Sequence, residues 1–389
     1  MGEQAKRGFE TTEYESRLVR AQEEMRARDL DAVVVTTPQN VRYFTGFATT
    51  FWESPTRPWF VILPREGQPI AVIPEIGAAG MAMTWVDDIR TWQAPRPEDD
   101  GLSLLASVFD ALPVTTARIG WEMGRESVVR MPIADFDRLR GMMRGTEFVD
   151  ASPLIWALRM IKSDGEISRI ATACTIACDA FDALPEKLSA GQTEHGAAQA
   201  YRALLAEHGA DSVPFLSVCS GEAGYSQIIV GPTERTLSAG DVLFVDVGAT
   251  YDGYFSDFNR NFSFGPPEDA VRRAHETLWQ ATEAGIAAAR PGATMEDLFH
   301  AMSGIIDAGG YAPPTTGRLG HGLGMHLTEP PSHMPGDRTV IAEGMVLTIE
   351  PGLEYVPGKM LVHEEDIAIR DGAAELLTRR SPQEMVVVG

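Results

Sequence analysis

The stretch LSAGDVLFVDVGATY (237–251) recurs as IAEGMVLTIEPGLEY (341–355), in an alignment without gaps at an offset of 104 residues. Several glycine, valine, leucine and tyrosine residues are identical at aligned positions, and Asp246 aligns with Glu350. Self-similarity at a fixed period is the mark of a repeated supersecondary unit. We therefore expect an α+β domain with an internal pseudo-twofold repeat, in which the two acids occupy equivalent places near the axis.

A second pair of segments supports the repeat. AGQTEHGAAQAYRALLAEHG (190–209) matches PGATMEDLFHAMSGIIDAGG (291–310) at an offset of 101. In each copy a threonine, Thr193 or Thr294, is a candidate helix N-cap, and a glycine closes the helix. Each repeat is thus predicted to be a helix followed by strands.

The first part of the chain has a different pattern, in which helix and strand alternate. A helix is expected from about residue 11 to 28, a buried strand at DAVVV (31–35), and a hairpin formed by WFVIL (59–63) and PIAVI (69–73). Ser163 followed by Glu166 is a capping-box signature that begins a new long helix. We place the domain boundary at 157, which gives an α/β domain over 1–157 and the repeat-containing domain over 158–389.

Composition limits the partners and the compartment. The 389 residues contain 33 lysines and arginines against 55 acids, a net charge of −22 that disfavours nucleic acid and anionic membranes. The cysteines, Cys174, Cys178 and Cys219, are too few for a disulfide framework and read as buried thiols. With neither an apolar signal core at the N-terminus nor a run of eighteen apolar residues, the sequence predicts a cytoplasmic protein.

Acids gather where the first repeat turns back. In VLFVDVGATYDGYFSDFNRNF (242–262), Asp252-Gly253 is a preferred two-residue hairpin turn. That turn pairs Tyr251 with Tyr254 and Asp246 with Asn259, so that Asp246 and Asp257 share one face of the sheet. In the second repeat, a turn at Pro357-Gly358 sets Glu350 opposite Glu365.

Four inward carboxylates would repel one another unless cations lay between them. All histidines of the chain follow residue 194, and His321, between glycines in GRLGHGLGMHL (317–327), is the best candidate for a nitrogen ligand. Mostly oxygen ligands with one imidazole suit two divalent ions, and manganese, iron, cobalt and zinc all remain possible.

These residues resemble the metal-binding signature of the pita-bread metallopeptidases, a family that includes Xaa-Pro dipeptidase, aminopeptidase P, methionine aminopeptidase and creatinase. The matching frames are VDVG, YFSDFNR, GHGLG, TIEPG and EEDIAI, and NVRYFTGF (40–47) is similar to the creatinase-type N-terminal domain of the Xaa-Pro dipeptidase branch. The resemblance implies an α/β creatinase-type domain followed by an α+β pita-bread catalytic domain.

The resemblance also implies roles for the ligands. Asp246 and Glu365 would bridge two metal ions, manganese first among the candidates. Asp257 would complete the shell of one ion, and His321 and Glu350 that of the other. Glu350 would also carry a proton in catalysis.

The chain departs from the peptidase pattern at two places. Seven residues after the ligand histidine the family has a second histidine, and here Thr328 stands there, followed by Glu329. Upstream, where the peptidases have another histidine, this chain has Ser226, Gln227 and Ile228. We consider His326 and His333 as the replacement catalytic residues.

The loop FATTFWESPTRPWF (47–60) is rich in aromatic and turn-forming residues. It is either an Ω-loop packed on its own domain or a partner contact. In dimeric members of the Xaa-Pro branch this domain approaches the active site of the other subunit. By that resemblance we predict a homodimer in which Trp52 and Arg57 lie near the partner's site.

Three functions follow, in order of preference. The first is a dinuclear metallohydrolase that cleaves a C–N amide bond in a small substrate, most simply an Xaa-Pro dipeptide. The second is a non-peptidase of the same fold, either a hydrolase of small amides or amidines or a dimethylsulfoniopropionate-type lyase, which the missing histidines favour. The third is a catalytically silent binding protein, although such relatives usually lose the metal ligands.

Overall fold

The computed structural model describes residues 4–54, 57–113, 117–312 and 317–389. Its internal contacts divide the chain into two units. One unit is Lys6–Arg159, and the other is Met160–Gly389 together with the N-terminal residues up to Ala5. Each unit has its own hydrophobic core.

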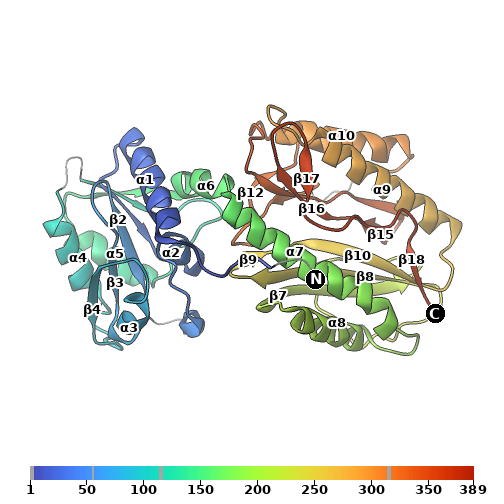
Figure 1. Ribbon diagram of the computed structural model, residues 1–389, viewed down its shortest axis with the longest axis horizontal. Helices are drawn as coiled ribbons and strands as arrows, with labels where there is room; N and C mark the ends of the chain where they lie inside the picture. The colour runs from blue at the N-terminus through green and yellow to red at the C-terminus, as the bar shows by residue number, and fades with distance from the viewer. Residues whose placement is uncertain (1–3, 55–56, 114–116, 313–316) are drawn as a thin grey trace. The chain divides into compact units, whose positions relative to one another are not determined.

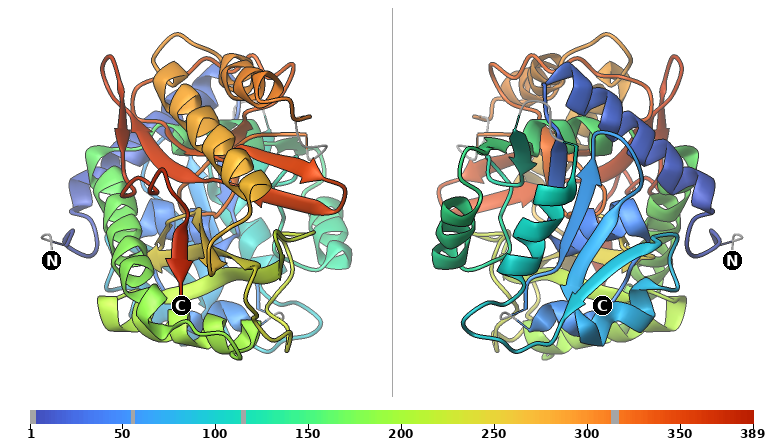
Figure 2. Two further views of the ribbon diagram at one scale, coloured as in Figure 1. Left: turned by 90° about the vertical axis from the view of Figure 1, so that its right-hand side faces the viewer. Right: turned by 90° about the vertical axis from the view of Figure 1, so that its left-hand side faces the viewer.

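The unit Lys6–Arg159 is built on one six-stranded sheet with helices on both faces (Figure 2, right). The strands lie in the order β4-β3-β2-β1-β5-β6, and β2 and β3 form the predicted antiparallel hairpin. Helices α4 and α5 cover one face through Leu105, Val108 and Leu139. The elements are α1 (Thr11–Ala27), β1 (Ala32–Val35), α2 (Pro38–Thr45), β2 (Phe60–Pro64), β3 (Ile70–Pro74), α3 (Ala78–Met81), β4 (Asp88–Trp92), α4 (Leu102–Ala111), β5 (Arg118–Trp121), α5 (Ile133–Met142), β6 (Glu147–Asp150) and α6 (Ser152–Met160).

The second unit contains two five-stranded sheets and a short two-stranded one. In the first half, helices α7 and α8 run along the sheet of β7, β8 and β10, and in the second half α9 and α10 accompany the later strands (Figure 1). The elements of the first half are α7 (Asp164–Ala183), α8 (Glu194–His208), β7 (Ser212–Glu222), β8 (Asp241–Tyr251), β9 (Tyr254–Phe255) and β10 (Phe258–Phe264). Those of the second are α9 (Asp269–Ala288), α10 (Met295–Ala308), β11 (His321–Gly322), β12 (Glu329–Ser332), β13 (Val346–Ile349), β14 (Gly352–Val356), β15 (Lys359–Val362), β16 (Glu365–Ile369), β17 (Ala374–Leu376) and β18 (Val386–Val388).

The internal repeat is confirmed down to individual backbone hydrogen bonds. The N–H of Gly191 donates to the carbonyl of Leu237, at 2.8 Å between nitrogen and oxygen, and Gly292 donates to Ile341 in the same way at 3.0 Å. Thr193 and Thr294 cap α8 and α10 with their side-chain oxygens, as predicted. Ser163 and Glu166 form the predicted capping box at the start of α7.

The central strand β8 is buried along its whole length, and its two faces look into different cores. Val245 and Val247 pack with α7 and α8. Phe244, on the opposite face, packs with α9 and with β14 and β15 of the second half. Because side chains alternate along a strand, Asp246 points the same way as Phe244, toward the second repeat.

Two further findings concern the whole chain. Cys174, Cys178 and Cys219 are buried free thiols, as predicted. Among the described helices, none has the length and apolar character needed to cross a lipid bilayer.

Candidate metal centre

A tight hairpin positions the two aspartates of the first repeat. Asp252 and Gly253 both have positive φ, 51° and 82°, as a two-residue turn of the predicted kind requires. The Nε of Arg169 donates to the carboxylate of Asp252 at 2.7 Å and fixes this turn. The predicted pairs Tyr251 with Tyr254 and Asp246 with Asn259 are both present.

A buried carboxylate outside the predicted set fixes the backbone of Asp257. Asp366 accepts a hydrogen bond from the Asp257 N–H at 2.9 Å and one from the thiol of Cys174 at 3.2 Å. Asp257 itself is only 4% exposed. The hydrogen bond from its backbone to Asp366 thus helps to fix the position of the Asp257 side chain.

His321 presents one free ring nitrogen to Asp257. Its Nδ1 lies 2.9 Å from the carbonyl oxygen of Gly322, and since a carbonyl only accepts, Nδ1 carries the proton. Nε2 is then the nitrogen with the lone pair, 3.5 Å from Oδ2 of Asp257. Burial and the nearby Arg318 lower the pKa of His321 to about 3, so the imidazole is neutral, as a metal ligand must be.

Glycine at position 320 lets this segment approach its neighbours closely, as the sequence predicted. Gly320 has a φ of +135°, and a Cβ there would collide with the carbonyl oxygen of Thr348 and with His333. Any other residue would push His321 away from Asp257.

The structure corrects the predicted ligand Glu365. A β-bulge between Glu354 and Val356 shifts the register of the second hairpin by one residue. Ile349, and not Glu350, therefore lies opposite Glu365. A one-residue slip moves every following side chain to the other face of a strand. The neighbour Glu364 consequently takes the place expected for Glu365.

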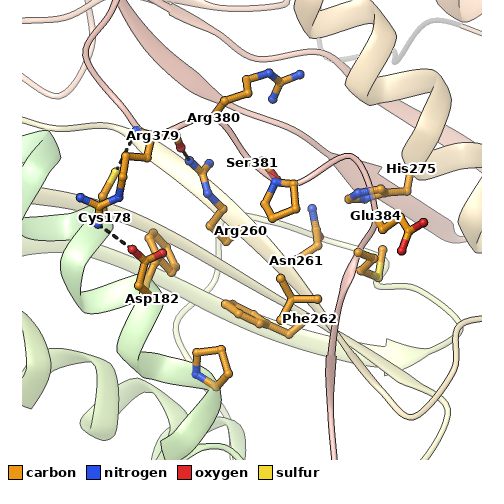
Figure 3. A pocket seen from close by; sticks show the side chains of 15 residues that line it. Cys178, Asp182, Arg260, Asn261, Phe262, His275, Arg379, Arg380, Ser381 and Glu384 are labelled. Carbon is orange, nitrogen blue, oxygen red and sulfur yellow. Dashed lines mark hydrogen bonds and ion pairs between the residues drawn. The ribbon is translucent and has the colours of Figure 1, made fainter.

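Both carboxylate oxygens of Glu365 accept hydrogen bonds on the other face of the strand. One of its oxygens accepts from Arg260 at 3.0 Å and from the hydroxyl of Thr378, and the other accepts from Arg380 at 3.0 Å and the Ser381 N–H at 2.8 Å. Figure 3 shows Arg260, Arg380 and Ser381 at a pocket of about 490 Å³. None of the predicted ligands lines this pocket, among the residues that the structure describes.

Asp257, His321 and Glu364 form a cluster whose potential ligand atoms all lie within 4.8 Å of one another. Burial, and then the charges of the neighbouring acids, raise the pKa values of Asp246, Asp257 and Glu364 well above their usual range. Oδ1 of Asp246 and Oε2 of Glu364 are buried and have no hydrogen-bond partner among the residues that the structure describes. Buried acceptors of this kind are expected where a cation binds, so the residues present fit a metal centre.

Glu350 lies at the end of β13, where it is half-buried. Its backbone N–H donates to the carbonyl of Leu319 at 3.0 Å, which ties it to the segment that holds His321. Burial raises the pKa of Glu350 to about 7, against the opposing effect of Arg318. This placement is compatible with both expected roles, ligand and proton carrier.

His333 is a structural histidine, which corrects its prediction as a catalytic residue. It is fully buried, its Nε2 contacts the carbonyl oxygen of Thr348 at 2.8 Å, and its Nδ1 lies 3.2 Å from the sulfur of Met295. Burial lowers its pKa to about 4. Nε2 therefore donates to the carbonyl of Thr348, and Nδ1 lies against the sulfur of Met295, so that both edges of the ring face the core.

His326 and Thr328 lie on a half-buried loop that a buried ion pair holds. Glu329 contacts Lys162 at 3.2 Å and accepts the backbone N–H of His326 at 3.1 Å. The acid that follows Thr328 is therefore an anchor of the loop.

The loop carrying Trp52 and Arg57 contacts its own unit. Trp52 packs on Trp59, with ring centroids 5.6 Å apart, and the guanidinium of Arg130 lies over the Trp52 ring at 5.0 Å. The guanidinium of Arg57 lies 5.1 Å from the centroid of Phe51. These contacts hold the loop against its own unit.

Sequence reasoning missed Glu364, Asp366 and Lys162. The bulge that exchanges Glu364 for Glu365 lies in a stretch without a distinctive motif, and two adjacent glutamates cannot be told apart by residue type. Lys162 and Asp366 are far in sequence from the groups they contact. The one sequence signal for Asp366 is side-chain alternation, which puts Asp366 on the same face as Glu364.

Together, the paired acids, the neutral imidazole and the repeated α+β core define a metal-dependent hydrolase. Two family models match the chain: "Metallopeptidase family M24" over residues 168–371 and "Creatinase/Prolidase N-terminal domain" over residues 17–161. The first of these covers more than half of the chain. The protein therefore belongs to metallopeptidase family M24.

Individual relatives match most of the chain. It is 30% identical to a probable dipeptidase PepE of Mycobacterium tuberculosis over 98% of both chains. It is 28% identical to an Xaa-Pro dipeptidase of Lactobacillus helveticus, over 88% of this chain and 91% of that one. The crystal structure of a prolidase from Thermococcus sibiricus superposes with a TM-score of 0.87, at 27% identity, over 98% of this chain and 100% of that one.

The two adjacent glutamates provide a matched pair of variants. We expect Glu364→Gln to weaken Mn²⁺ binding at least tenfold, about 1.4 kcal/mol, because it removes a charged ligand. Its metal-free fold should be unchanged or more stable, since one of the crowded acids is neutralised. Glu365→Gln should destabilise the fold by about 3 kcal/mol, because it breaks a buried ion pair. Calorimetric titration and urea unfolding test both; a stable Glu365→Gln protein that no longer binds Mn²⁺ would contradict the assignment.

The raised pKa values also predict how stability depends on pH. Above about pH 4 the unfolded chain releases protons that the folded metal-free site retains, so these groups lower stability as pH rises. For Glu350 this loss extends from about pH 4.5 to about pH 7. We expect the melting temperature of metal-free protein to fall more steeply between pH 5 and 7.5 in the native chain than in Glu364→Gln. Equal slopes would show that these carboxyl groups are not protonated in the folded state.

Proposed function

We propose that this chain is a dinuclear metal-dependent hydrolase that cleaves the C–N amide bond of a small substrate, in the first place an Xaa-Pro dipeptide. The observation that carries the proposal is the convergence of Asp257, His321 and Glu364. The matched Xaa-Pro dipeptidase and prolidase support the substrate class. Family membership supports divalent cations, and manganese is our proposal for their identity.

The residues that would hold the metal ions are Asp246, Asp257, His321, Glu350 and Glu364. When bound, two divalent cations polarise an amide carbonyl and activate water at neutral pH. The hydrogen bond from His321 to Gly322 fixes the orientation of the imidazole, as outer contacts of metal ligands generally do. We propose that Glu350, whose pKa burial raises to about 7, holds the proton that must reach the leaving amine.

Of the two histidines proposed as replacements, His326 remains. Its backbone is anchored by the carboxylate of Glu329, which Lys162 holds in turn. We propose that this loop presents His326 or Thr328 to the substrate.

A second candidate is a non-peptidase of the same fold that acts on a small amide, amidine or betaine-like metabolite. The observation that favours it is the loss of both peptidase imidazoles, at Ile228 and Thr328, together with the structural role of His333. This candidate uses the same metal centre but a different organic substrate.

The assembly and location are proposals as well. We propose a homodimer in which Trp52 and Arg57 lie near the partner subunit's active site, with domains over 1–157 and 158–389. The three buried free thiols support a cytoplasmic location, where cysteines stay reduced.

The function is tested with a panel of Xaa-Pro dipeptides and purified enzyme reloaded with Mn²⁺. We expect hydrolysis that a chelator abolishes and that Mn²⁺ restores, and that Glu364→Gln lowers by at least a hundredfold. His326→Ala separates the two candidates for the proton-handling group: a reduced kcat supports His326, and full activity supports Thr328 or water. Failure of metal-loaded protein on every dipeptide would favour the metabolite hydrolase, and small amides would be assayed next.

The dimer is tested separately with Arg57→Ala. We expect native-size dimers on light scattering, a raised KM and an unchanged melting temperature, because Arg57 would act on the neighbouring site. An unchanged KM and kcat would exclude a role for Arg57 in catalysis.

A further inference from the structure

Asn259 lies within the acidic site without being one of its acids. It is directly opposite Asp246 in the pairing of β10 with β8, and it follows Asp257, the residue just before β10, by two positions. Cross-strand partners have Cβ atoms about 4.5–5.5 Å apart and point to the same side of the sheet. The side chain of Asn259 therefore lies on the same side of the sheet as that of Asp246.

The carboxamide of Asn259 is buried, and no described residue forms a hydrogen bond with it. The residue is 2% exposed, and neither Oδ1 nor Nδ2 has a hydrogen-bond partner in the part of the chain that the structure describes. Oδ1 of Asp246 and Oε2 of Glu364 are in the same condition. A buried amide that bonds to nothing is costly and is rarely found in folded proteins.

Asn261 is the internal comparison for this statement. It is the same residue type, two positions along β10, and it points to the same face. Its Nδ2 donates to the carbonyl of Val362 at 2.7 Å, and its Oδ1 accepts from the hydroxyl of Tyr225 at 3.0 Å. One asparagine of NRN is thus saturated by the protein, while the other is open toward the acids.

We propose that Asn259 is a further contact residue of the metal centre. Its carboxamide is completed by the occupied centre, a cation at Oδ1 or a water molecule of the centre at Nδ2. A neutral amide suits this position because it adds a ligand without a fifth negative charge, and carbonyl oxygens are ordinary ligands of manganese and magnesium. The inference rests on the proposed metal-dependent function and adds a residue to its site.

The test compares Asn259→Leu with Asn261→Leu, two changes of the same size on the same strand. Mn²⁺ affinity and stoichiometry are measured by calorimetric titration, and the melting temperature is measured on chelator-treated protein. We expect Asn259→Leu to weaken Mn²⁺ binding by roughly 10–100-fold, the usual effect of removing a supporting contact of a metal site. Its metal-free melting temperature should be equal to or above that of the native chain, because an unsatisfied buried amide is removed.

Asn261→Leu should behave in the opposite way. Its metal-free protein should melt at least about 2–4 °C lower, since Tyr225 and Val362 lose their partners. The proposal would be overturned if Asn259→Leu bound Mn²⁺ with the affinity of the native chain. It would also be overturned if metal-free Asn259→Leu melted at a temperature as low as that of Asn261→Leu. If the native chain itself bound no Mn²⁺, the metal centre of the proposed function would fail, and the role of Asn259 with it.

Discussion

The protein buries acids of like charge in one place, and the rest of its catalytic unit is arranged around that constraint. Asp246, Asp257 and Glu364 are each less than 8% exposed, and burial together with mutual repulsion raises their pKa values. Without cations these groups must take up protons or destabilise the fold. The metal-free site therefore lowers the stability of the fold, and a bound cation would remove this cost.

Other buried charges in the same unit are neutralised by ion pairs and hydrogen bonds. Glu365 is as deeply buried as Glu364, yet each of its oxygens accepts two hydrogen bonds, from two guanidinium groups, a hydroxyl and a backbone N–H. Lys162 and Glu329 likewise neutralise each other. Among the described residues, Oδ1 of Asp246, Oε2 of Glu364 and the carboxamide of Asn259 have no hydrogen-bond partner, in contrast to both oxygens of Glu365.

His321 and His333 differ in the same way, one directed toward the proposed metal centre and the other packed within the fold. Nδ1 of His321 donates to a backbone carbonyl and Nε2 points toward Asp257, whereas both edges of the His333 ring face the core. At the positions where the family has two further histidines, this member of family M24 has Ile228 and Thr328. Four of the five expected ligands, Asp246, Asp257, His321 and Glu350, keep their proposed role, and Glu364 replaces Glu365 beside Asp257 and His321.

The sequence by itself determined the repeat, the first hairpin and its pairs, and the histidine between glycines, because these depend on local patterns. Asp252-Gly253 requires positive φ at both positions, and that local requirement fixes the register through to Asp246 and Asn259. The choice of Glu364 over Glu365 was decided only by the tertiary structure. It depends on a bulge near Tyr355, and strand register has a period of two residues, so one inserted residue exchanges the two faces. The role of His333 was also beyond the sequence, since it depends on Thr348 and Met295, which reach it from other parts of the chain.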